Sequence, residues 1–450
     1  MKPIISIIVT SYNIEKYISA CLDGLINQTI TDIEIIIVDD GSTDRTPEII
    51  AEYARTDKRI IPVLNKENSI GGVATPANVG IGLAKGKYIG FADGDDLYDP
   101  GMFQALYLAA ERNDASMSIC AYKEMSGELN ELKAPFDPAW EVIKELGCID
   151  TTTVESKKKV LELQPVPWRK LYKASLLKDN EILFPVGPCF FEDNGFHWFT
   201  TLSGTKVAIV NETLCFHRKN RVGQSTASDG NRLLGVFHQH SVIWRFLSEK
   251  NLLAEYRDYS LNWLGVHLSW VQQVISPTYS DEFYKTLVPH FDLYTHSEIR
   301  HHLSNKYYDR KSVELIVSVL RKDCSFFCEI MNGKVSTSYA EKVKFNLFKL
   351  GPCSFICMVF RVMKAKLVPA KKINNDSAVN ELVLSNLNDI QEQLSELRCD
   401  LNLVNSKIAQ LEISCINNNA DVNHSLLAVG HKISEVERLI ENKLSIKIKT

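Results

Sequence analysis

Apolar and polar positions along the first hundred residues predict strands and helices in turn. Apolar residues recur at helical spacing over residues 14–28 and 77–84, and a further helix is predicted through Ile49 and Tyr53. The runs between these helices are apolar on both faces, as expected for strands in a covered parallel sheet. They are residues 4–9, 34–38, 60–64 and 88–92. Repeated strand–helix units of this length predict a doubly wound, mostly parallel α/β sheet with right-handed crossovers.

After this α/β domain, placed at residues 1–226, the pattern becomes helical and predicts a small helical domain at residues 227–340. Its histidines have no carboxylate or cysteine at a convincing ligand spacing, so we expect them on solvated helix faces. Two cysteine pairs loosely resemble zinc-ligand pairs, but both lie in apolar helical surroundings without turn glycines, so zinc is not predicted. The pairs are Cys324 with Cys328 and Cys353 with Cys357.

Residues 341–373 form a distinct basic and apolar segment. Between Lys342 and Lys372 there are eight basic residues and no acidic one, interleaved with bulky side chains such as Phe345, Phe348 and Phe360. This pattern is typical of a segment that lies at the surface of an anionic membrane, although a helix packed on the catalytic domain with a basic outer face is the alternative. Liposome flotation of a chain ending before Lys342 would separate the two.

Residues 381–445 show a heptad pattern that predicts a coiled coil. The seam is interrupted near Cys415 and Asn418 and resumes displaced by four residues, a stutter that locally unwinds the supercoil. Its first part consists of Leu387, Ile390, Leu394, Leu397, Leu401, Val404, Ile408 and Leu411. One long helix with a narrow apolar stripe predicts a homo-oligomer or a partner coiled coil, and leucine and isoleucine at both seam positions leave dimer, trimer and tetramer open. Mass measurement in solution, with and without these residues, tests the prediction.

Composition narrows the classes of protein. With 450 residues, 45% of them hydrophobic and 24% charged, the chain resembles a globular protein of several domains. A net charge of -4 gives no basic field, so nucleic acid is not an expected partner. The 11 cysteines lie in apolar runs, which suits reduced thiols in a cytoplasmic protein. We expect no secretory signal and no spanning helix, because no apolar run is long enough.

The fourth predicted strand runs directly into the sequence Asp93-Gly94-Asp95-Asp96. Acidic side chains crowded at one strand end repel each other unless a cation joins them, although an ordinary acidic turn is the alternative. Carboxylate oxygens suit Mg²⁺ or Mn²⁺, which leave further positions to phosphate oxygens. Ligands of such sheets bind at the carboxyl ends of the strands, where these residues lie.

Four motifs in order and spacing resemble those of family 2 glycosyltransferases, which have the GT-A fold. Later elements that resemble the same family extend the likeness over about residues 1–226. The four motifs are Ser6–Asn13, Val38–Asp44, Asn78–Gly80 with Ala84–Tyr88, and Asp93–Asp96. The later elements are Trp168–Tyr172, Phe184-Pro185, Phe191–Asp193 with Phe196, and Phe216–Arg218. One departure is Ala77, where the family commonly has arginine.

The resemblance implies roles for particular residues. The residues expected to bind the nucleotide-sugar are Thr10, Tyr12, Asn13, Asp39, Asp40, Asn78, Asp93 and Gly94. Those expected to hold Mn²⁺ or Mg²⁺ are Asp95, Asp93 and His217, with His217 otherwise a structural residue. Asp193 is expected to be the catalytic base with Glu192 beside it, whereas the alternative is an acidic pair that opens a helix. Acceptor or phosphate contacts are assigned to Trp168, Arg169, Lys170 and Arg218, although Trp168 and Tyr172 could simply pack the core.

The sequence thus predicts an inverting glycosyltransferase that uses a UDP-linked sugar donor and a glycan or lipid-linked acceptor. The resemblance implies bacterial surface polysaccharide synthesis, at the inner face of the cell membrane. The alternative is a degenerate transferase domain, suggested by Ala77, that assembles partners through the coiled coil. A nucleotidyltransferase is disfavoured because no glycine-rich phosphate loop follows the first strand.

Overall fold

A computed structural model describes residues 2–126, 131–187, 190–219, 230–305 and 308–333. These residues belong to one compact unit, Met1–Ser336. The predicted basic segment and coiled coil lie outside the described residues, and so does the expected boundary near residue 226. Both segments and that boundary stay predictions.

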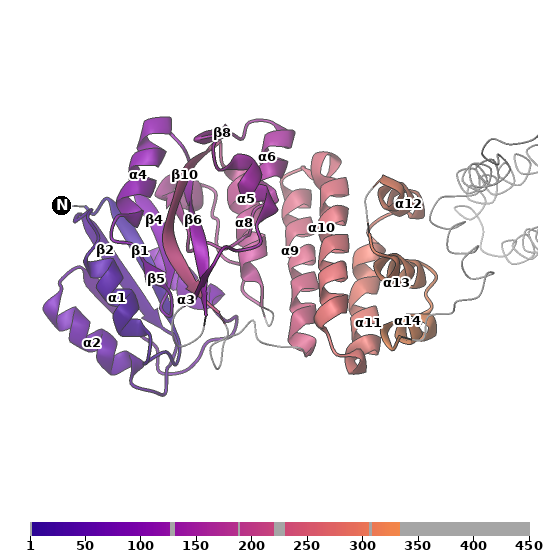
Figure 1. Ribbon diagram of the computed structural model, residues 1–450, viewed down its shortest axis with the longest axis horizontal. Coiled ribbons are helices and arrows are strands. Elements are labelled where there is room, and N and C mark those ends of the chain that lie inside the picture. The colour runs from indigo at the N-terminus through magenta and orange to yellow at the C-terminus, as the bar shows by residue number, and fades with distance from the viewer. Residues whose placement is uncertain (1, 127–130, 188–189, 220–229, 306–307, 334–450) are drawn as a thin grey trace, which may run out of the picture. The chain divides into compact units, whose positions relative to one another are not determined.

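The described chain combines a mixed, mostly parallel sheet with helices, which confirms the predicted α/β class (Figure 1). The strand order is β3-β2-β1-β4-β9-β6-β10-β5. Strands β3, β2, β1 and β4 are parallel neighbours, β9 runs antiparallel to β4 and β6, and β10 runs parallel to β6. Short strands β5 and β8 pair with β10, and β7 pairs with β6. The strands are β1 (Ile5–Ser11), β2 (Ile33–Asp39), β3 (Ile60–Leu64), β4 (Tyr88–Asp93), β5 (Leu97–Tyr98), β6 (Met117–Ser126), β7 (Glu131–Lys133), β8 (Cys148–Asp150), β9 (Lys170–Lys173) and β10 (Lys206–Arg218).

Helices cover both faces of this sheet, because successive residues of each central strand point to opposite sides. Ile7 contributes to the core cluster that includes α1 and α4, whereas Ile8 contributes to the cluster that includes α3 and α8. Both isoleucines are fully buried. The helices of this part are α1 (Ile18–Ile26), α2 (Thr46–Thr56), α3 (Ala74–Leu83), α4 (Met102–Asn113), α5 (Pro138–Ile143), α6 (Val154–Leu161), α7 (Ala174–Asp179) and α8 (Glu192–Ser203).

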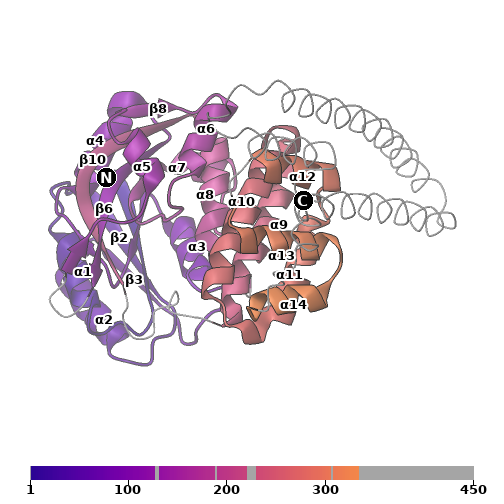
Figure 2. The same ribbon diagram turned by 45° about the vertical axis from the view of Figure 1, so that its right-hand side comes forward.

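A helical region follows the sheet and begins against α8, as Figure 2 shows. Phe199 of α8 stacks on Phe246 of α9 with ring centroids 4.5 Å apart, and Phe191 meets Trp270 of α10 edge to face. The elements are η1 (Asn231–Leu234), α9 (Gly235–Glu249), α10 (Leu253–Val274), η2 (Pro277–Tyr279), α11 (Ser280–Phe291), α12 (His296–Asn305), α13 (Arg310–Leu320) and α14 (Cys324–Met331). No helix among the described residues is long and apolar enough to cross a membrane.

The prediction that the histidines of this region lie on solvated faces is wrong for several of them. His240, His290 and His302 are buried. His240 satisfies its ring by hydrogen bonds to His290 at 3.2 Å and to the Tyr294 hydroxyl at 3.0 Å. Hydrogen-bonded partners remove the cost of burying polar rings, and a helical periodicity cannot reveal such partners.

A buried ion pair fixes the segment between β7 and α6 to the sheet. Arg169 Nη2 lies 2.7 Å from Asp137 Oδ2, and both side chains are almost fully buried. The guanidinium also lies over the rings of Tyr122 and Trp140. Asp137→Ala should lower the free energy of unfolding by about 3–5 kcal/mol, because it leaves a buried charge without its partner. Urea denaturation monitored by tryptophan fluorescence measures this.

The control for that experiment is Glu141→Ala on α5. Glu141 also forms an ion pair, with Lys144, but its side chain is 66% exposed. Exposed pairs contribute less than about 1 kcal/mol, so this variant should denature near the wild-type midpoint. An equal loss of unfolding free energy in both variants would contradict the stabilising role assigned to the Arg169–Asp137 ion pair.

Candidate active site

The carboxyl ends of β1 and β4 meet at one edge of the sheet, as the parallel pairing requires. Thr10 of β1 lies beside Asp93, the last residue of β4. The chain turns immediately: the Gly94 N–H donates to the Thr10 carbonyl at 3.1 Å, and the Asp96 N–H donates to the Asp93 carbonyl at 3.1 Å. A Cβ on Gly94 would lie 2.6 Å from a methyl carbon of Ile14. Glycine is therefore needed here for close packing, which is a different role from the predicted nucleotide contact.

His217 reaches this turn from the end of β10. Its Nδ1 lies 2.9 Å from Asp96 Oδ2, and the Arg218 backbone N–H donates to Asp96 Oδ1 at 2.7 Å. The imidazole stacks on Trp168 with ring centroids 4.7 Å apart. Burial lowers the pKa of His217, but the charge and hydrogen bond of Asp96 outweigh burial and hold it above its ordinary value. Because Asp96 engages Nδ1, Nε2 is the ring nitrogen that could bind a metal.

Three ligand atoms at this point are close enough to share one metal ion. Atoms of Asp93, Asp96 and His217 all lie within 4.8 Å of one another. Burial raises the pKa of Asp93 well above its ordinary value, and the charges of Asp96 and Asp95 raise it further. A divalent cation would relieve this repulsion, and carboxylate and imidazole ligands suit Mn²⁺ or Mg²⁺. The donor set therefore fits such an ion.

The membership of this cluster differs from the prediction at one position. Asp93 and His217 come together as expected, but the third member is Asp96 rather than Asp95. The Asp95 carbonyl accepts a hydrogen bond from Arg218 Nε at 3.0 Å. Sequence reasoning missed Asp96 because its partner, His217, is 121 residues away in the chain.

Glu192 and Asp193 open α8 after Phe191, whose left-handed backbone has a φ of 71°. Burial raises the pKa of Asp193 to about 6, against the lowering effect of the positive charges of Lys170 and His217. Burial and the charge of Asp193 raise the pKa of Glu192 to about 8. Near pH 7 Asp193 is thus largely ionised while Glu192 keeps its proton. Of the two, Asp193 is the carboxylate that can accept a proton.

The predicted nucleobase residues gather at the ends of β1 and β2. Asp39 is fully buried and accepts hydrogen bonds from Ser11 Oγ at 3.0 Å and from Ser42 Oγ at 2.6 Å. Asn13 has a left-handed backbone, with φ of 50°, and its Oδ1 accepts from the Thr43 N–H at 2.8 Å. These bonds join the loops after β1 and β2 into one surface. The Tyr12 side chain is 45% exposed beside them.

Asp40 holds a neighbouring loop. Its carboxylate accepts from Asn65 Nδ2 at 3.1 Å and from Ser69 Oγ at 2.9 Å. Gly41, with a left-handed φ of 76°, lets the Glu67 backbone approach, since an added Cβ would lie 2.4 Å from the Glu67 carbonyl carbon. Asp40 thus has a structural role in holding the loop that contains Asn65 and Ser69, and its role in nucleotide binding stays a prediction.

Asn78 receives a different role from the one predicted. Its Nδ2 donates to the Phe184 carbonyl and its Oδ1 accepts from the Phe184 N–H, each at 2.8 Å. Both ends of the amide therefore hydrogen-bond to the backbone of one residue, Phe184, and we assign Asn78 to positioning this segment. Ala77, at the position of the family's usual arginine, is buried in the core cluster behind the sheet.

The residues predicted to contact acceptor or phosphate divide into two groups. Trp168, Arg169 and Lys170 are buried, and Trp168 stacks on His217. Lys170 Nζ donates to the Pro165 carbonyl at 3.2 Å, and burial lowers the pKa of this amine well below its usual value. Arg218 is only partly buried and remains a candidate phosphate contact.

Comparisons with known proteins identify the family of this chain. The family model described as "Glycosyl transferase family 2" matches residues 6–159. Glycosyltransferase GlyG of Streptococcus pneumoniae is 31% identical over 230 residues, which are 49% of this chain and 72% of GlyG. The chain belongs to glycosyltransferase family 2. An uncharacterized glycosyltransferase of Bacillus subtilis, EpsJ, is 36% identical over 222 residues, 49% of this chain and 62% of EpsJ.

Solved structures show a similar fold. A crystal structure of S. aureus TarS, residues 1–349 with UDP, aligns with a TM-score of 0.57 at 20% sequence identity. The alignment covers 74% of this chain and 91% of the TarS chain. The mostly parallel sheet of the predicted GT-A architecture is thus confirmed.

Proposed function

We propose that this chain is an inverting, metal-dependent glycosyltransferase that moves a sugar from a UDP-linked donor to a hydroxyl group of a glycan or lipid-linked acceptor. The observation that carries the proposal is the meeting of Asp93, Asp96 and His217 at the carboxyl end of β4, with an ionised Asp193 in electrostatic range. Family 2 membership supports sugar transfer as the reaction class.

The choice of UDP is supported by the structural neighbours. TarS of S. aureus has been crystallised with UDP and with UDP-GlcNAc, at TM-scores of 0.57 and 0.54 to this chain. In this chain Tyr12 and Asn13 are exposed beside the fully buried Asp39, where the base and ribose would lie. Asp39 is already oriented by Ser11 and Ser42, which would fix its direction toward a donor N–H of the base.

The reaction follows from the two sets of carboxylates. Asp93 and His217, with Asp96 orienting the imidazole, would hold the divalent cation, which neutralises negative charge on the diphosphate leaving group when bound. Asp193 takes the proton of the acceptor hydroxyl, whose oxygen forms a bond to the anomeric carbon as the bond from that carbon to the diphosphate oxygen breaks. One direct displacement inverts the anomeric configuration.

The test is a panel of nucleotide-sugars incubated with the full chain, manganese and candidate glycan acceptors. Release of nucleoside diphosphate that stops with EDTA and returns with added Mn²⁺ is the expected result. If no donor were turned over and nothing changed on chelation, the transferase proposal would fail and a scaffold role would be favoured. Nuclear magnetic resonance of the product gives the anomeric configuration.

The pH dependence tests the assignment of the base. Transfer requires Asp193 without its proton, and its pKa of about 6 means that the rate should fall as pH drops through this value. The predicted profile of kcat/KM therefore rises between about pH 5 and 7. A rate that stayed level down to pH 5 would contradict Asp193 as the base.

A further inference from the structure

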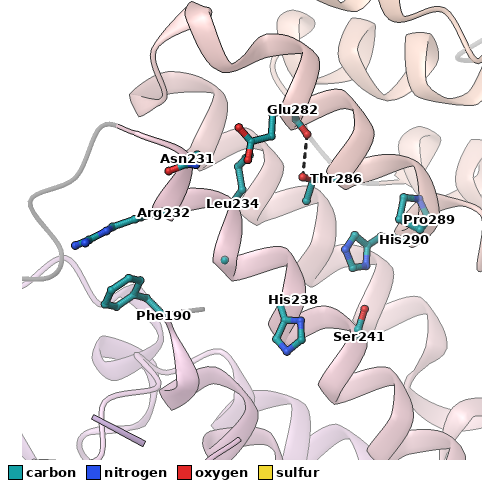
Figure 3. Close-up of a pocket in the computed structure, with 11 residues that line it drawn as sticks. Phe190, Asn231, Arg232, Leu234, His238, Ser241, Glu282, Thr286, Pro289 and His290 are labelled. Carbon is teal, nitrogen blue, oxygen red and sulfur yellow. Dashed lines mark hydrogen bonds between the residues drawn. The ribbon is translucent and has the colours of Figure 1, made fainter. Parts of the chain in front are cut away.

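A cavity lies in the helical region, between η1, α9 and α11 (Figure 3). Its volume is about 490 Å³, which is within the range of ligand sites in proteins. Residues of η1 and α9 face residues of α11 across it. The lining residues are mostly polar. They are Phe190, Asn231, Arg232, Leu234, Gly235, His238, Ser241, Glu282, Thr286, Pro289 and His290.

The lining offers both hydrogen-bond donors and acceptors. Arg232 can only donate, the Glu282 carboxylate accepts, and the Thr286 hydroxyl, which donates to the Glu282 carbonyl at 2.8 Å, keeps its lone pairs as acceptors. His290 is uncharged near neutral pH, because burial and the neighbouring His238 lower its pKa to about 4. The lining holds both the positive charge of Arg232 and the negative charge of Glu282, so a simple anion is disfavoured. A ligand with neighbouring hydroxyl groups matches this lining, because each hydroxyl group can both donate and accept a hydrogen bond.

The cavity shares a wall with the catalytic segment. Phe190 precedes Phe191, Glu192 and Asp193, and its carbonyl accepts from Gln239 Nε2 of α9 at 3.4 Å. The Arg232 guanidinium lies over the Phe190 ring, 5.2 Å from its centroid.

Phe190 also lies near the loop before α3. A Cβ added to Gly72 would lie 3.9 Å from the Phe190 ring and 3.8 Å from Glu192 Oε1. Phe190 thus borders the cavity and lies close to the segment that opens α8. An acceptor that reaches Asp193 along this segment would pass Phe190 and enter the cavity.

We propose that this cavity is a subsite for the acceptor beyond its reacting hydroxyl, and that it binds a segment rich in neighbouring hydroxyl groups. Glu282 accepts hydrogen bonds from these hydroxyl groups, and Arg232 and His238 lie at the Phe190 side of the same cavity. The inference rests on the proposed function, since it needs Asp193 to act on an acceptor. An oligosaccharide and a polyol phosphate both carry this chemistry.

The test is binding of two probes to the full chain, maltotriose for the first source and sorbitol 6-phosphate for the second, measured by saturation-transfer NMR titration. At least one probe is expected to bind, and Glu282→Gln should weaken it about tenfold, because the hydrogen bonds then go to a neutral amide oxygen instead of a charged carboxylate. Glu249→Gln is the matched control: Glu249 is exposed at the end of α9 and outside the cavity. Thermal melting of each variant confirms folding.

Binding of neither probe, or equal affinity in the Glu282→Gln and Glu249→Gln variants, would overturn the subsite. Binding of sorbitol 6-phosphate alone would support it with a polyol phosphate as the source. In the donor panel, Glu282→Gln should retain hydrolysis of the donor but raise the acceptor KM about tenfold, and an unchanged KM would also overturn it. UDP titration with manganese on the same samples separates failure of the subsite from failure of the proposed function. Absence of UDP binding would count against the proposed function. UDP binding without binding of either probe would count only against the subsite.

Discussion

Asp193→Asn is expected to lower the rate of sugar transfer by about 10²–10⁴-fold, the usual contribution of a general base. Asparagine keeps the shape of the side chain but cannot take the proton of the acceptor hydroxyl. Affinity for UDP should stay close to that of the wild-type chain, because the expected nucleotide residues lie on the loops after β1 and β2. Steady-state kinetics with the best donor of the panel, together with calorimetric titration of UDP, measure both quantities.

Glu192→Gln is the control for this experiment, since Glu192 is the neighbouring carboxylate on the same turn of α8. Its pKa of about 8 means that the side chain already carries a proton near pH 7, and glutamine resembles that protonated form. We expect this variant to lose much less activity. If Glu192→Gln were the more damaging change, the roles of the two residues would have to be exchanged.

Replacing Asp93 and Asp95 together by alanine should abolish the dependence of UDP affinity on manganese. Loss of a residue that merely supports a metal ligand costs about 10–100-fold in metal affinity, so loss of expected ligands should cost at least about 100-fold. Calorimetry with UDP at fixed manganese concentration measures the change. Unaltered affinity in the double variant would defeat the metal-dependent mechanism.

Two comparisons sharpen this result. Asp179→Ala removes an exposed carboxylate at the end of α7, away from the strand ends, and should leave UDP affinity as it was. Single variants of Asp95 and Asp96 then show which carboxylate the effect follows. The structure favours Asp96 as the partner of His217, whereas the resemblance favours Asp95 as a direct ligand.

Local pattern was enough to predict the strands of the first hundred residues. The predicted strands at residues 4–9, 34–38, 60–64 and 88–92 are confirmed as β1, β2, β3 and β4, in parallel register. Successive residues of a strand point to opposite faces of the sheet. Ile7 and Ile8 of β1 accordingly belong to different core clusters, as the uninterrupted apolar run predicted for a strand that is buried on both faces. The carboxyl-end position of Asp39 and Asp93 follows directly from parallel pairing.

The sequence by itself determined the order of the strands and helices in the first hundred residues. It also determined the strand ends at which the acidic motifs lie. Only the tertiary structure decided the partners: Asp96 with His217, Arg169 with Asp137, and Asn78 with Phe184. Hydrophobic periodicity reports which face of an element is buried, over a few residues at a time. Partners from distant segments meet through strand order and side-chain packing, and these depend on the whole compact unit rather than on any local pattern.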